Sequence, residues 1–310
     1  MHVITGSKNI PLYPDDCNVA IGNFDGVHQG HRKIIKVLLE EAKKDNLYPL
    51  LLTFHPHPAK VLTDRKIELL QTLEQRLTEI KKSGVRMVVV ISFDHTFAQI
   101  TAEEFIRTII IQKLKAKKVI VGENFRFGKD RLGDVAELNK LAPQYGFSVQ
   151  SILPLTVEDS MVSSSLIREL LHLGEIERAN TLIGRPYEIE GTVVRGKSRG
   201  KRLGFPTANI HPLNDIAPPG VFISKVWIGS KIFQAVTHVG SKPTFNEKEI
   251  MIESYIIDYN NSLYEKKLCV QFLKRIREEM KFETPEALSS QIKKDLDETL
   301  TYFHKQSHQS

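Results

Sequence analysis

The first half of the chain alternates short apolar runs with longer segments in which apolar residues recur at helical spacing. The apolar runs predict strands over residues 19–22, 49–54, 86–92, 118–121 and 148–152. One of the helices between them has a readable start and stop, because Thr72 and Gln75 fit a capping box and Gly84 follows its last turn. The pattern predicts five βα units, and hence an α/β fold in which helices cover both faces of a parallel sheet.

The pattern changes near residues 182–186, where apolar stretches follow one another with only Gly, Pro or Asn turns between them. The stretches "YEIEGTVVRG", "GVFISKVWIG", "KIFQAVTHVG" and "ESYIIDYNN" read as successive strands, for which an antiparallel barrel is the simplest closure. A last helix is predicted with Thr284 as N-cap and Pro285 at its first position. We therefore expect two domains, residues 1–183 and 184–310, the second a barrel with a C-terminal helix.

Composition and charge narrow the class of partner. The chain has 310 residues, of which 41% are hydrophobic, and its 43 basic and 37 acidic side chains give a net charge of +6. Without a long basic run this excess suits phosphorylated small ligands as well as nucleic acid, and we expect no nucleic-acid partner. Cys17 and Cys269 are too far apart in sequence for a C-x-x-C redox or zinc pair, which favours a reducing cytoplasm.

No targeting or membrane segment is predicted. Pro11, Pro14, Asp15 and Asp16 interrupt the N-terminal region where a secretory signal needs an unbroken apolar run, and no later stretch reaches membrane-spanning length. We expect a cytoplasmic protein with no membrane partner. Composition and pattern leave the oligomeric state open.

The stretch "IGNFDGVHQGHR" at residues 21–32 carries the first candidate site. It leaves a predicted strand and enters a helix, so its glycines let the backbone approach a ligand where free helical N–H groups favour anions. The candidate nucleotide-binding residues of this loop are Gly22, Phe24, Gly26 and Gly30. The loop predicts a phosphate cradle that has no Walker lysine.

His28 and His31 would project from this loop and from the first helical turn on one side. Both imidazoles would then donate to one phosphate group and stabilise the charged pentavalent phosphorus of a phosphoryl or nucleotidyl transfer. Two other interpretations stay open for an isolated H-x-x-H: polar histidines that cap a helix, and a zinc pair, which lacks a third ligand nearby. The neighbouring glycines favour the phosphate site.

Two later stretches add candidate ligands. In "VGENFRFGKDRLGD" a loop follows the fourth predicted strand and offers Asn124 and Arg126, while Phe125 and Phe127 fit a flat ring or the core equally well.

In "MVSSSLIREL" three serines open a helix and an arginine follows one turn later, which suits a leaving pyrophosphate. The serines are Ser163, Ser164 and Ser165, and the candidate ligands of the pyrophosphate are Ser164, Ser165 and Arg168. Ordinary N-capping explains one serine but not three together with the arginine.

The motifs "GNFDGVHQGHR", "TFHPHP", "GENFRFG" and "VSSSLIR", in this order, resemble the adenylyltransferase module of the bacterial bifunctional riboflavin kinase/FAD synthetase family. The stretches "GRPYEIEGTVVRGKSRGKRLGFPTANI", "PPGVF", "HVGSKPTF", "ESYIIDY" and "IREEMKF" resemble its kinase module, so the likeness spans almost the whole chain. It implies a Rossmann-like nucleotidyltransferase domain followed by a six-stranded riboflavin kinase barrel. The substrates and products it implies are riboflavin, FMN, FAD and ATP.

In the first module the resemblance assigns His28, His31 and Asn124 to the ATP phosphates during adenylyl transfer. It assigns Ser164, Ser165 and Arg168 to the departing pyrophosphate. The FMN phosphate is the attacking group, and because it is already ionised at neutral pH this step needs no general base.

In the second module a ribityl hydroxyl must be activated, which calls for a carboxylate that accepts its proton. The resemblance assigns this role to Glu253, which by itself reads as a solvated charge at a strand end. It also implies Mg²⁺, because the hydroxyl and amide of Thr207 and Asn209 are hard oxygen ligands suited to Mg²⁺ and its ATP. The remaining expected cofactor-binding residues are Gly196, Lys201 and Gly204 of a loop over the phosphates, and Arg277 near the flavin, which also reads as a surface charge.

Several positions depart from the usual pattern of the family. His55 stands where Glu is common and Ser165 where Thr is common in the first module, and in the second module His238 replaces Asn, Lys242 replaces Arg and Glu265 replaces Gly. We expect both activities, because His28, His31 and Glu253 are present. The alternatives are a chain with one impaired domain, an H-x-G-H adenylyltransferase for nicotinate mononucleotide or a pantetheine phosphate, and an inactive flavin- or RNA-binding regulator.

Overall fold

The computed structural model describes residues 1–6, 15–63, 66–196, 204–243 and 248–307 of the chain. Internal contacts divide the chain into two compact units, Met1–Ser163 and Ser164–Ser310. This division comes earlier than the expected boundary at 183/184, because two helices, α6 (Ser164–His172) and α7 (Ile176–Ile183), group with the second unit.

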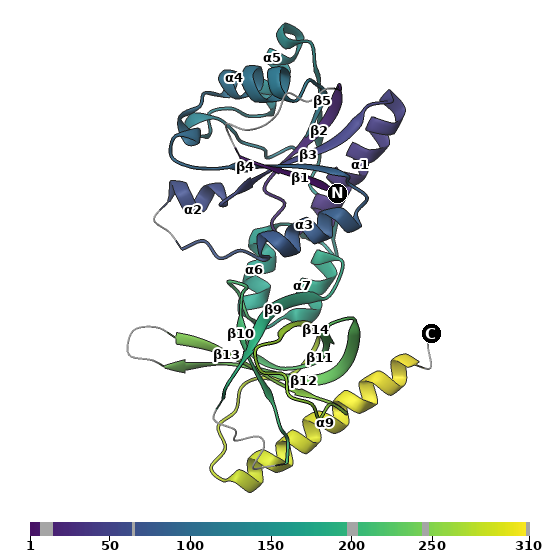
Figure 1. Cartoon of the computed structure of the whole chain (residues 1–310), viewed down its shortest axis with the longest axis vertical. Coiled ribbons are helices and arrows are strands. Elements are labelled where there is room, and N and C mark those ends of the chain that lie inside the picture. Colours follow the sequence, from purple (N-terminus) through teal and green to yellow (C-terminus); the bar gives the residue numbers. More distant parts are fainter. Residues whose placement is uncertain (7–14, 64–65, 197–203, 244–247, 308–310) are drawn as a thin grey trace. The chain divides into compact units, whose positions relative to one another are not determined.

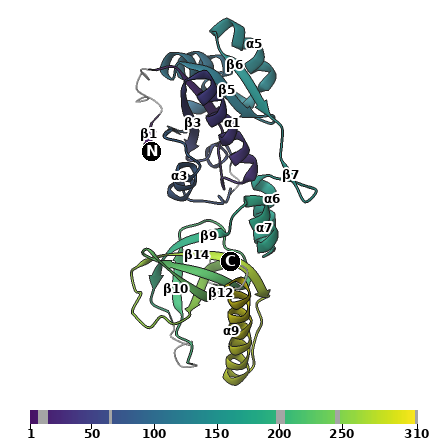
Figure 2. The ribbon, with the colours of Figure 1, turned by 90° about the vertical axis from the view of Figure 1, so that its right-hand side faces the viewer.

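The first unit is an α/β domain, labelled in Figures 1 and 2. Its strands are β1 (His2–Thr5), β2 (Cys17–Ile21), β3 (Tyr48–His55), β4 (Met87–Ser92), β5 (Ala116–Gly122), β6 (Ser148–Ile152), β7 (Thr156–Val157) and β8 (Ser160–Met161). Its helices are α1 (Gln29–Asp45), α2 (Pro58–Leu62), α3 (Leu73–Lys82), η1 (Phe97–Gln99), α4 (Ala102–Glu104), the π-helix η2 (Phe105–Lys113), η3 (Lys129–Arg131) and α5 (Val135–Tyr145).

Six of these strands form one parallel sheet in the order β1-β4-β3-β2-β5-β6. The five predicted strands are confirmed, with ends shifted by a few residues, and β1 is an edge strand that the apolar pattern did not predict. The capping box of α3 is also confirmed, since the Thr72 hydroxyl accepts the Gln75 N–H and the Gln75 side chain accepts the Thr72 N–H. Because β2 and β5 are neighbours, the chain reverses its direction of winding between them, and this pair is the switch point of the sheet.

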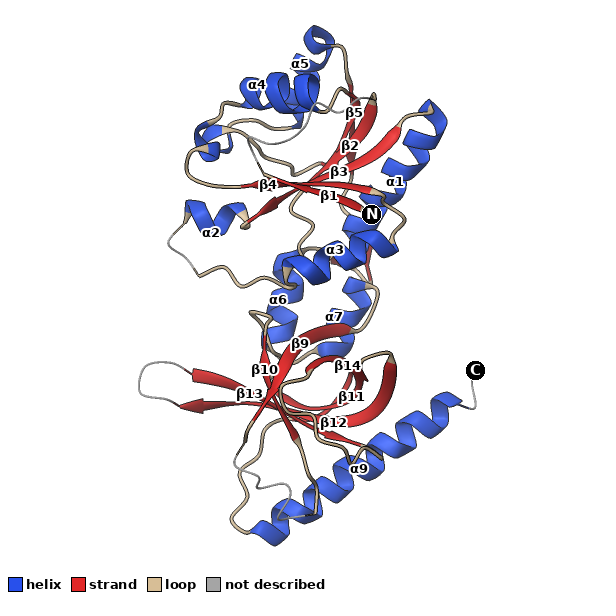
Figure 3. Ribbon diagram, viewed as in Figure 1, coloured by secondary structure: helices blue, strands red, loops and turns tan. Residues whose placement is uncertain are grey.

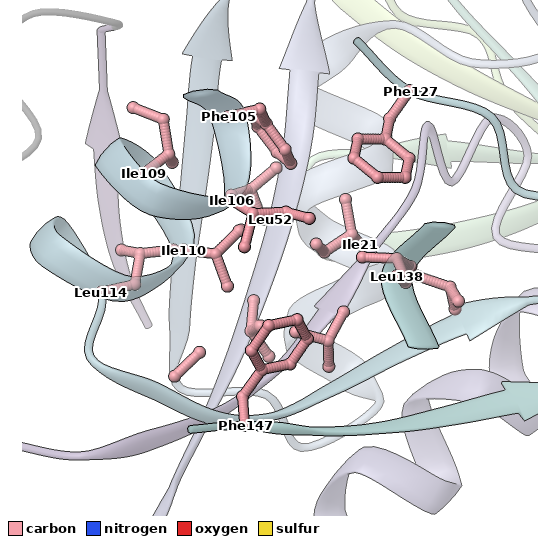
Figure 4. Close-up of a cluster of buried hydrophobic side chains, with 14 of the residues drawn as sticks. Ile21, Leu52, Phe105, Ile106, Ile109, Ile110, Leu114, Phe127, Leu138 and Phe147 are labelled. Carbon is pink, nitrogen blue, oxygen red and sulfur yellow. The ribbon is translucent and has the colours of Figure 1, made fainter. Parts of the chain in front are cut away.

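Successive residues of each strand pack on opposite faces of the sheet, as the two-residue repeat of a strand requires. Val19 and Ile21 lie in one buried cluster, with η2 and α5, which Figure 4 shows. Ala20 lies in the other buried cluster, with residues of α1 and α3 such as Ile35 and Ile80. The prediction of helices on both faces of a parallel sheet is therefore confirmed.

The second unit contains α6, α7, six longer strands and a last helix, shown by secondary structure in Figure 3. These elements are β9 (Tyr187–Val194), β10 (Ala208–Pro212), β11 (Gly220–Ile228), β12 (Lys231–Pro243), β13 (Lys248–Ile256), β14 (Lys267–Arg277) and α9 (Pro285–Ser307). The strands close into an antiparallel barrel in the order β10-β13-β12-β11-β14-β9, and β9 pairs with β10. The predicted barrel and C-terminal helix are confirmed, and the Thr284 hydroxyl accepts the Ala287 N–H at the start of α9.

Helix α7 is tied to the barrel by a half-buried amide. The Asn180 side chain donates to the Phe272 carbonyl at 2.8 Å and accepts the Tyr187 N–H at 2.7 Å. Leu182 and Ile183 of the same helix are buried. Hydrogen bonds and apolar contacts thus make α7 a part of the barrel unit.

Candidate active sites

The first candidate site lies at the switch point between β2 and β5. The loop of residues 22–28 follows the carboxyl end of β2, and the loop of residues 123–134 follows that of β5. In open parallel sheets a ligand binds in the crevice at this point, because the two neighbouring loops diverge there. The topology thus brings the first two candidate motifs of the first unit to one edge.

Two glycines, Gly26 in the first loop and Gly30 in the first turn of α1, pack closely on their neighbours. Gly26 has φ +87°, and a Cβ there would lie 2.6 Å from Leu70 Cδ1. A Cβ at Gly30 would lie 3.2 Å from Cε1 of the His28 ring. The loop therefore packs closely both on the core and on the first histidine, which fixes its path.

His28 is the N-cap of α1 and is 5% exposed. Its Nδ1 accepts the backbone N–H of His31 at 3.3 Å, and the two imidazole rings stack with centroids 3.6 Å apart. Since Nδ1 uses its lone pair in this bond, the ring proton of neutral His28 sits on Nε2. The capping alternative is correct as a description of His28 Nδ1, and a role of this histidine in adenylyl transfer stays a prediction.

His31 is half-buried, and its pKa lies well below the usual histidine range. Burial is the main cause, and the nearby His28 and Arg76 add electrostatic repulsion. Within the described part of the chain, its Nδ1 is buried and has no hydrogen-bond partner. A neutral imidazole with a buried polar atom left unpaired suits a site where a ligand group completes the hydrogen bond.

Arg76 of α3 reaches the same edge, although no local signal in the sequence marks it. Its guanidinium donates to the carbonyls of Asn23, in the loop after β2, and of Phe54, in β3. The side chain is 4% exposed. An arginine in the first turns of an amphipathic helix ordinarily reads as a surface charge, so only the tertiary structure shows that this one is buried.

The remaining candidates of the first unit differ in exposure. Phe24 is fully buried, with its ring 5.3 Å from that of His31, so it supports the histidine from the core. Asn124 and Arg126 are exposed on the loop after β5, and Arg126 donates to the Phe125 carbonyl. Their contact with a ligand stays a prediction.

Aromatic rings gather at this edge of the sheet. Phe125 and Phe127 stack with centroids 5.3 Å apart, and Phe127 lies 5.8 Å from Phe105. Phe127 is buried and Phe125 is half-buried. The two alternatives left open by the sequence are thus divided between the residues: Phe127 belongs to the core, and Phe125 lies at its rim.

Ser164, Ser165 and Arg168 open helix α6, as expected from "MVSSSLIREL". The serines occupy its first turn, and Arg168 lies one turn later, so a helix N-terminus and a cation occur together. The helix groups with the second unit. The predicted part of these residues in binding pyrophosphate beside the histidines stays a prediction.

The second candidate site is a row of residues across the barrel. Asn209 of β10 is directly opposite Glu253 of β13, and Glu253 is directly opposite His238 of β12. Residues opposite each other in antiparallel strands point to the same face, and Glu253 lies between buried Ile252 and Ser254, so the row faces outward. Two paired strands, β10 and β13, thus bring the amide and the carboxylate together, although 44 residues separate them in sequence, from 209 to 253.

Gly196 and Asn209 are in close contact. A Cβ at Gly196 would collide with the Asn209 amide, which is 8% exposed, so the glycine makes room for this side chain. Thr207 is half-buried just before β10. Gly204 has φ +87° and open space around it, whereas Lys201 lies outside the described residues.

A metal at this site would depend on few protein ligands. Among the residues that the structure describes, no group of three or more His, Cys, Asp or Glu side chains is placed to hold a metal ion. The expected metal ligands, the Thr207 hydroxyl and the Asn209 amide oxygen, are hard oxygen donors two residues apart at the start of β10. Such a set fits Mg²⁺ that takes most of its ligands from nucleotide phosphates and water.

Arg277 is held by the last helix. Its Nε and Nη2 donate to the Asp295 carboxylate at 2.9–3.1 Å, and its Nη1 donates to the Glu278 carbonyl. Asp295 is 2% exposed and also accepts from Gln291. The structure thus gives Arg277 a structural role that neither sequence interpretation foresaw, while contact with the flavin stays a prediction.

Two departures from the family pattern can be located in the second unit. His238, a member of the row that contains Glu253, has its Nε2 3.6 Å from a carboxylate oxygen of Glu279. Glu265 has φ +65°, the left-handed region in which glycine is favoured. The glycine that is usual at this position therefore has a backbone reason.

Comparison with known proteins also divides the chain into two parts. A family model described as FAD synthetase matches residues 11–166, and one described as riboflavin kinase matches residues 183–303. The bifunctional riboflavin kinase/FMN adenylyltransferase of Buchnera aphidicola subsp. Schizaphis graminum is 35% identical over 98% of this chain and 99% of its own. That of Bacillus subtilis is 36% identical over 92% of each chain, and that of Escherichia coli K12 is 34% identical over 95% of this chain and 96% of its own.

A crystal structure described as a macrolide-efflux protein from Streptococcus pneumoniae superposes with a TM-score of 0.88 at 31% identity. It covers 96% of this chain and 98% of its own. No helix in the described part of this chain is long and apolar enough to cross a membrane. Because family models match both halves and relatives match nearly the full length, this chain belongs to the family of bifunctional riboflavin kinase/FMN adenylyltransferases.

Proposed function

We propose that the chain catalyses two reactions at two separate sites. The barrel unit transfers a phosphoryl group from ATP to riboflavin and makes FMN. The switch point of the first unit transfers the adenylyl group of a second ATP to FMN and makes FAD and pyrophosphate. The observation that carries this proposal is that Glu253 and the histidine pair lie in different compact units, the pair beside the switch point of the sheet and Glu253 in a row of polar side chains across the barrel.

In adenylyl transfer an oxygen of the FMN phosphate attacks the α-phosphorus of ATP, and the bond from that phosphorus to pyrophosphate breaks. No proton has to be removed, so catalysis consists of orientation and of donors aimed at the phosphorus oxygens. His28 Nε2–H and the neutral imidazole of His31 are these donors. The neutral His31 donates without binding the ground-state anion as tightly as a full positive charge would.

In the kinase reaction a ribityl hydroxyl oxygen attacks the γ-phosphorus, and the bond from that phosphorus to ADP breaks. Glu253 accepts the hydroxyl proton as the new bond forms. The carboxylate is half-buried on an outward face, where both water and a flavin substrate reach it. Asn209, directly opposite on β10, is placed to orient the same substrate group or the nucleotide phosphates.

The cofactor of this site is proposed to be Mg²⁺. When bound, it neutralises charge on the ATP phosphates. Thr207 and Asn209 would hold it together with phosphate oxygens, and Gly196 leaves the space that the Asn209 amide occupies. Replacing Asn209 with Leu should raise the Mg²⁺ concentration needed for FMN formation.

The flavin ring of FMN has a candidate platform in the first unit. Phe125 lies at the rim of the aromatic group at the carboxyl edge and is stacked on buried Phe127. Aromatic faces bind flat rings by offset stacking. The ligands of the complete protein are then riboflavin, FMN, FAD and ATP.

The test is a product analysis with crossed variants. Purified protein is incubated with riboflavin, ATP and Mg²⁺, and flavins are resolved by chromatography; we expect FMN first and FAD later. Glu253→Gln should stop FMN formation and still convert supplied FMN to FAD, whereas His28→Ala should do the reverse. Loss of both activities in either variant would contradict two separate sites, and no product at all would indicate a binding protein.

A further inference from the structure

Arg76 is a buried cation that the two proposed reactions do not explain. It is 4% exposed, and burial lowers its pKa while the nearby Asp25 acts in the opposite direction. Burying a guanidinium is costly unless its donors are used, so its position calls for a reason. Within the described residues its Nε has no hydrogen-bond partner.

The guanidinium joins two segments of the candidate nucleotide site. Nη1 donates to the Asn23 carbonyl at 2.7 Å, and Nη2 donates to the Phe54 carbonyl at 3.0 Å. The hydroxyl of Thr53 also donates to the Asn23 carbonyl, at 3.1 Å. The loop after β2 is thus fixed to β3 by side chains, at the point where it turns toward His28.

Asp25 fixes the same loop on its other side. Its carboxylate is 3% exposed and accepts the Leu70 N–H at 3.0 Å, so its charge is held near Arg76 by the backbone. This single carboxylate offsets only part of the positive charge of the guanidinium, so Arg76 still exerts an electric field on the groups around it.

The charge of Arg76 also reaches the histidines. It helps to lower the pKa of His31, where burial and His28 have larger effects. It also lowers the pKa of His55, where its effect is smaller than that of burial and larger than that of Lys60. The groups that act on His31 are therefore His28 and Arg76, and those that act on His55 are Arg76 and Lys60. A fixed cation beside neutral imidazoles favours a polyphosphate without protonating the donors.

We propose that Arg76 is a positioning residue for adenylyl transfer: its guanidinium holds the loop after β2 in the shape that places His28 and His31, and its charge keeps this edge positive. The inference rests on the proposed adenylyltransferase activity of the first unit. No motif of the family resemblance lies in α3, so the proposal gives this helix a part in catalysis that the motifs do not indicate.

Two variants separate the effect of the Arg76 charge from the effect of its paired N–H donors. Arg76→Met removes the charge and the donors but keeps an unbranched side chain, whereas Arg76→Lys keeps the charge and loses the paired donors. Lys82→Met is the matched control, because it removes a cation from the exposed end of the same helix, where Lys82 pairs with Glu79. Kinase activity of each variant reports on the second unit, and thermal unfolding reports on both.

The activity readout is FAD formation from supplied FMN. We expect Arg76→Met to lower kcat by about 100-fold and Arg76→Lys by about 10-fold, because displaced donors fail to reach the transition state. Riboflavin phosphorylation should stay unchanged in both, and Lys82→Met should match the unsubstituted protein in both reactions. FAD formation within about twofold of the unsubstituted protein in a folded Arg76→Met variant would overturn the inference.

A second readout does not depend on activity. The pKa of His31, followed by NMR of proteins labelled in the histidine rings, should rise in Arg76→Met and stay low in Arg76→Lys. If Arg76→Met does not fold, Arg76→Lys is the test. An unchanged kcat in Arg76→Lys would contradict the role of the paired guanidinium donors, and a raised His31 pKa in this variant would contradict the role of the charge. If the unsubstituted protein makes no FAD, the proposed adenylyltransferase activity is wrong. An unchanged His31 pKa in Arg76→Met would separately contradict the proposed role of the Arg76 charge.

Discussion

The histidine pair shows how one hydrogen bond assigns roles to two chemically identical side chains. His28 accepts a backbone N–H through Nδ1, so it caps α1 and keeps its proton on Nε2. His31 stacks on it and is kept neutral by burial and by two neighbouring groups. The capping role and the phosphate-binding role are therefore compatible, because they use different nitrogen atoms of one ring.

The lowered pKa of His31 predicts how the stability of the first unit depends on pH. Above the usual histidine pKa, ~6.5, the group is neutral in both states and contributes nothing. Below it, the unfolded chain binds a proton that the folded chain does not, so the free energy of unfolding falls as pH falls, by at most about 1.4 kcal/mol per pH unit for this group. Urea unfolding between pH 7.5 and 5.5 measures this slope.

Two substitutions isolate the contribution of His31. His31→Asn should reduce the slope, and His95→Asn, at an exposed position of the same unit, should leave it unchanged. An identical slope in His31→Asn would show that another group, such as His55, is responsible.

Glu265 predicts a stabilising substitution. Its φ of +65° costs a non-glycine residue about 1–2 kcal/mol, and glycine avoids this cost. Glu265→Gly should raise the free energy of unfolding of the barrel unit by about 1 kcal/mol, after the greater flexibility of glycine in the unfolded chain is subtracted. Lys266→Gly, one residue later where φ is not positive, should lower it, and a stabilising effect there would contradict the backbone argument.

At the scale of elements, α9 is held on the barrel by interactions of two kinds. Arg277 and Asp295 form a buried, bidentate pair, with 17% and 3% of their side chains exposed. Lys274 and Glu298 form an exposed pair at 3.0 Å, with 43% of each side chain exposed. Figure 2 shows α9 beside the barrel, and the barrel residues of both pairs, Lys274 and Arg277, lie on β14.

The two pairs should differ in their effect on stability. Asp295→Ala leaves the Arg277 guanidinium without its buried partner and should cost about 3 kcal/mol. Glu298→Ala removes a solvent-screened pair and should cost less than about 1 kcal/mol. Chemical denaturation gives both values, and hydrogen exchange should show loss of protection in α9 for the first variant alone. Equal costs would mean that burial does not determine the strength of these pairs.

At the scale of the whole molecule, the chain is built from two units whose division does not coincide with the change in pattern. The FAD synthetase match ends at residue 166 and the riboflavin kinase match begins at 183, so most of α6 and nearly all of α7 lie outside both matches. Contacts assign these helices to the barrel, through Asn180 and through the buried face of α7.

This assignment predicts which of two fragments forms the more stable isolated kinase unit. A fragment of residues 164–310 should fold and phosphorylate riboflavin, whereas residues 184–310 should be less stable by several kcal/mol, because the fragment loses the Asn180 bonds and exposes apolar surface. Thermal unfolding of the two fragments measures the difference. Equal stability would place the boundary at 183/184, as the sequence pattern predicts.

Local signals in the sequence were sufficient for most of the elements and for part of each site. Apolar runs identified five of the sheet strands, the capping box identified the start of α3, and the glycines identified the loop at the carboxyl end of β2. These features are readable because their causes act within a few residues: strand and helix periodicity, cap hydrogen bonds, and the backbone freedom of glycine.

Other features were decided only when distant segments paired. Strand order made β2 and β5 neighbours, and barrel register aligned Asn209 with Glu253. Burial made Arg76 an internal cation and enclosed the Asp295 partner of Arg277. The sequence by itself determined which elements and which chemical groups this protein has, while the tertiary structure decided which groups meet, because register and burial depend on contacts between residues far apart in the chain.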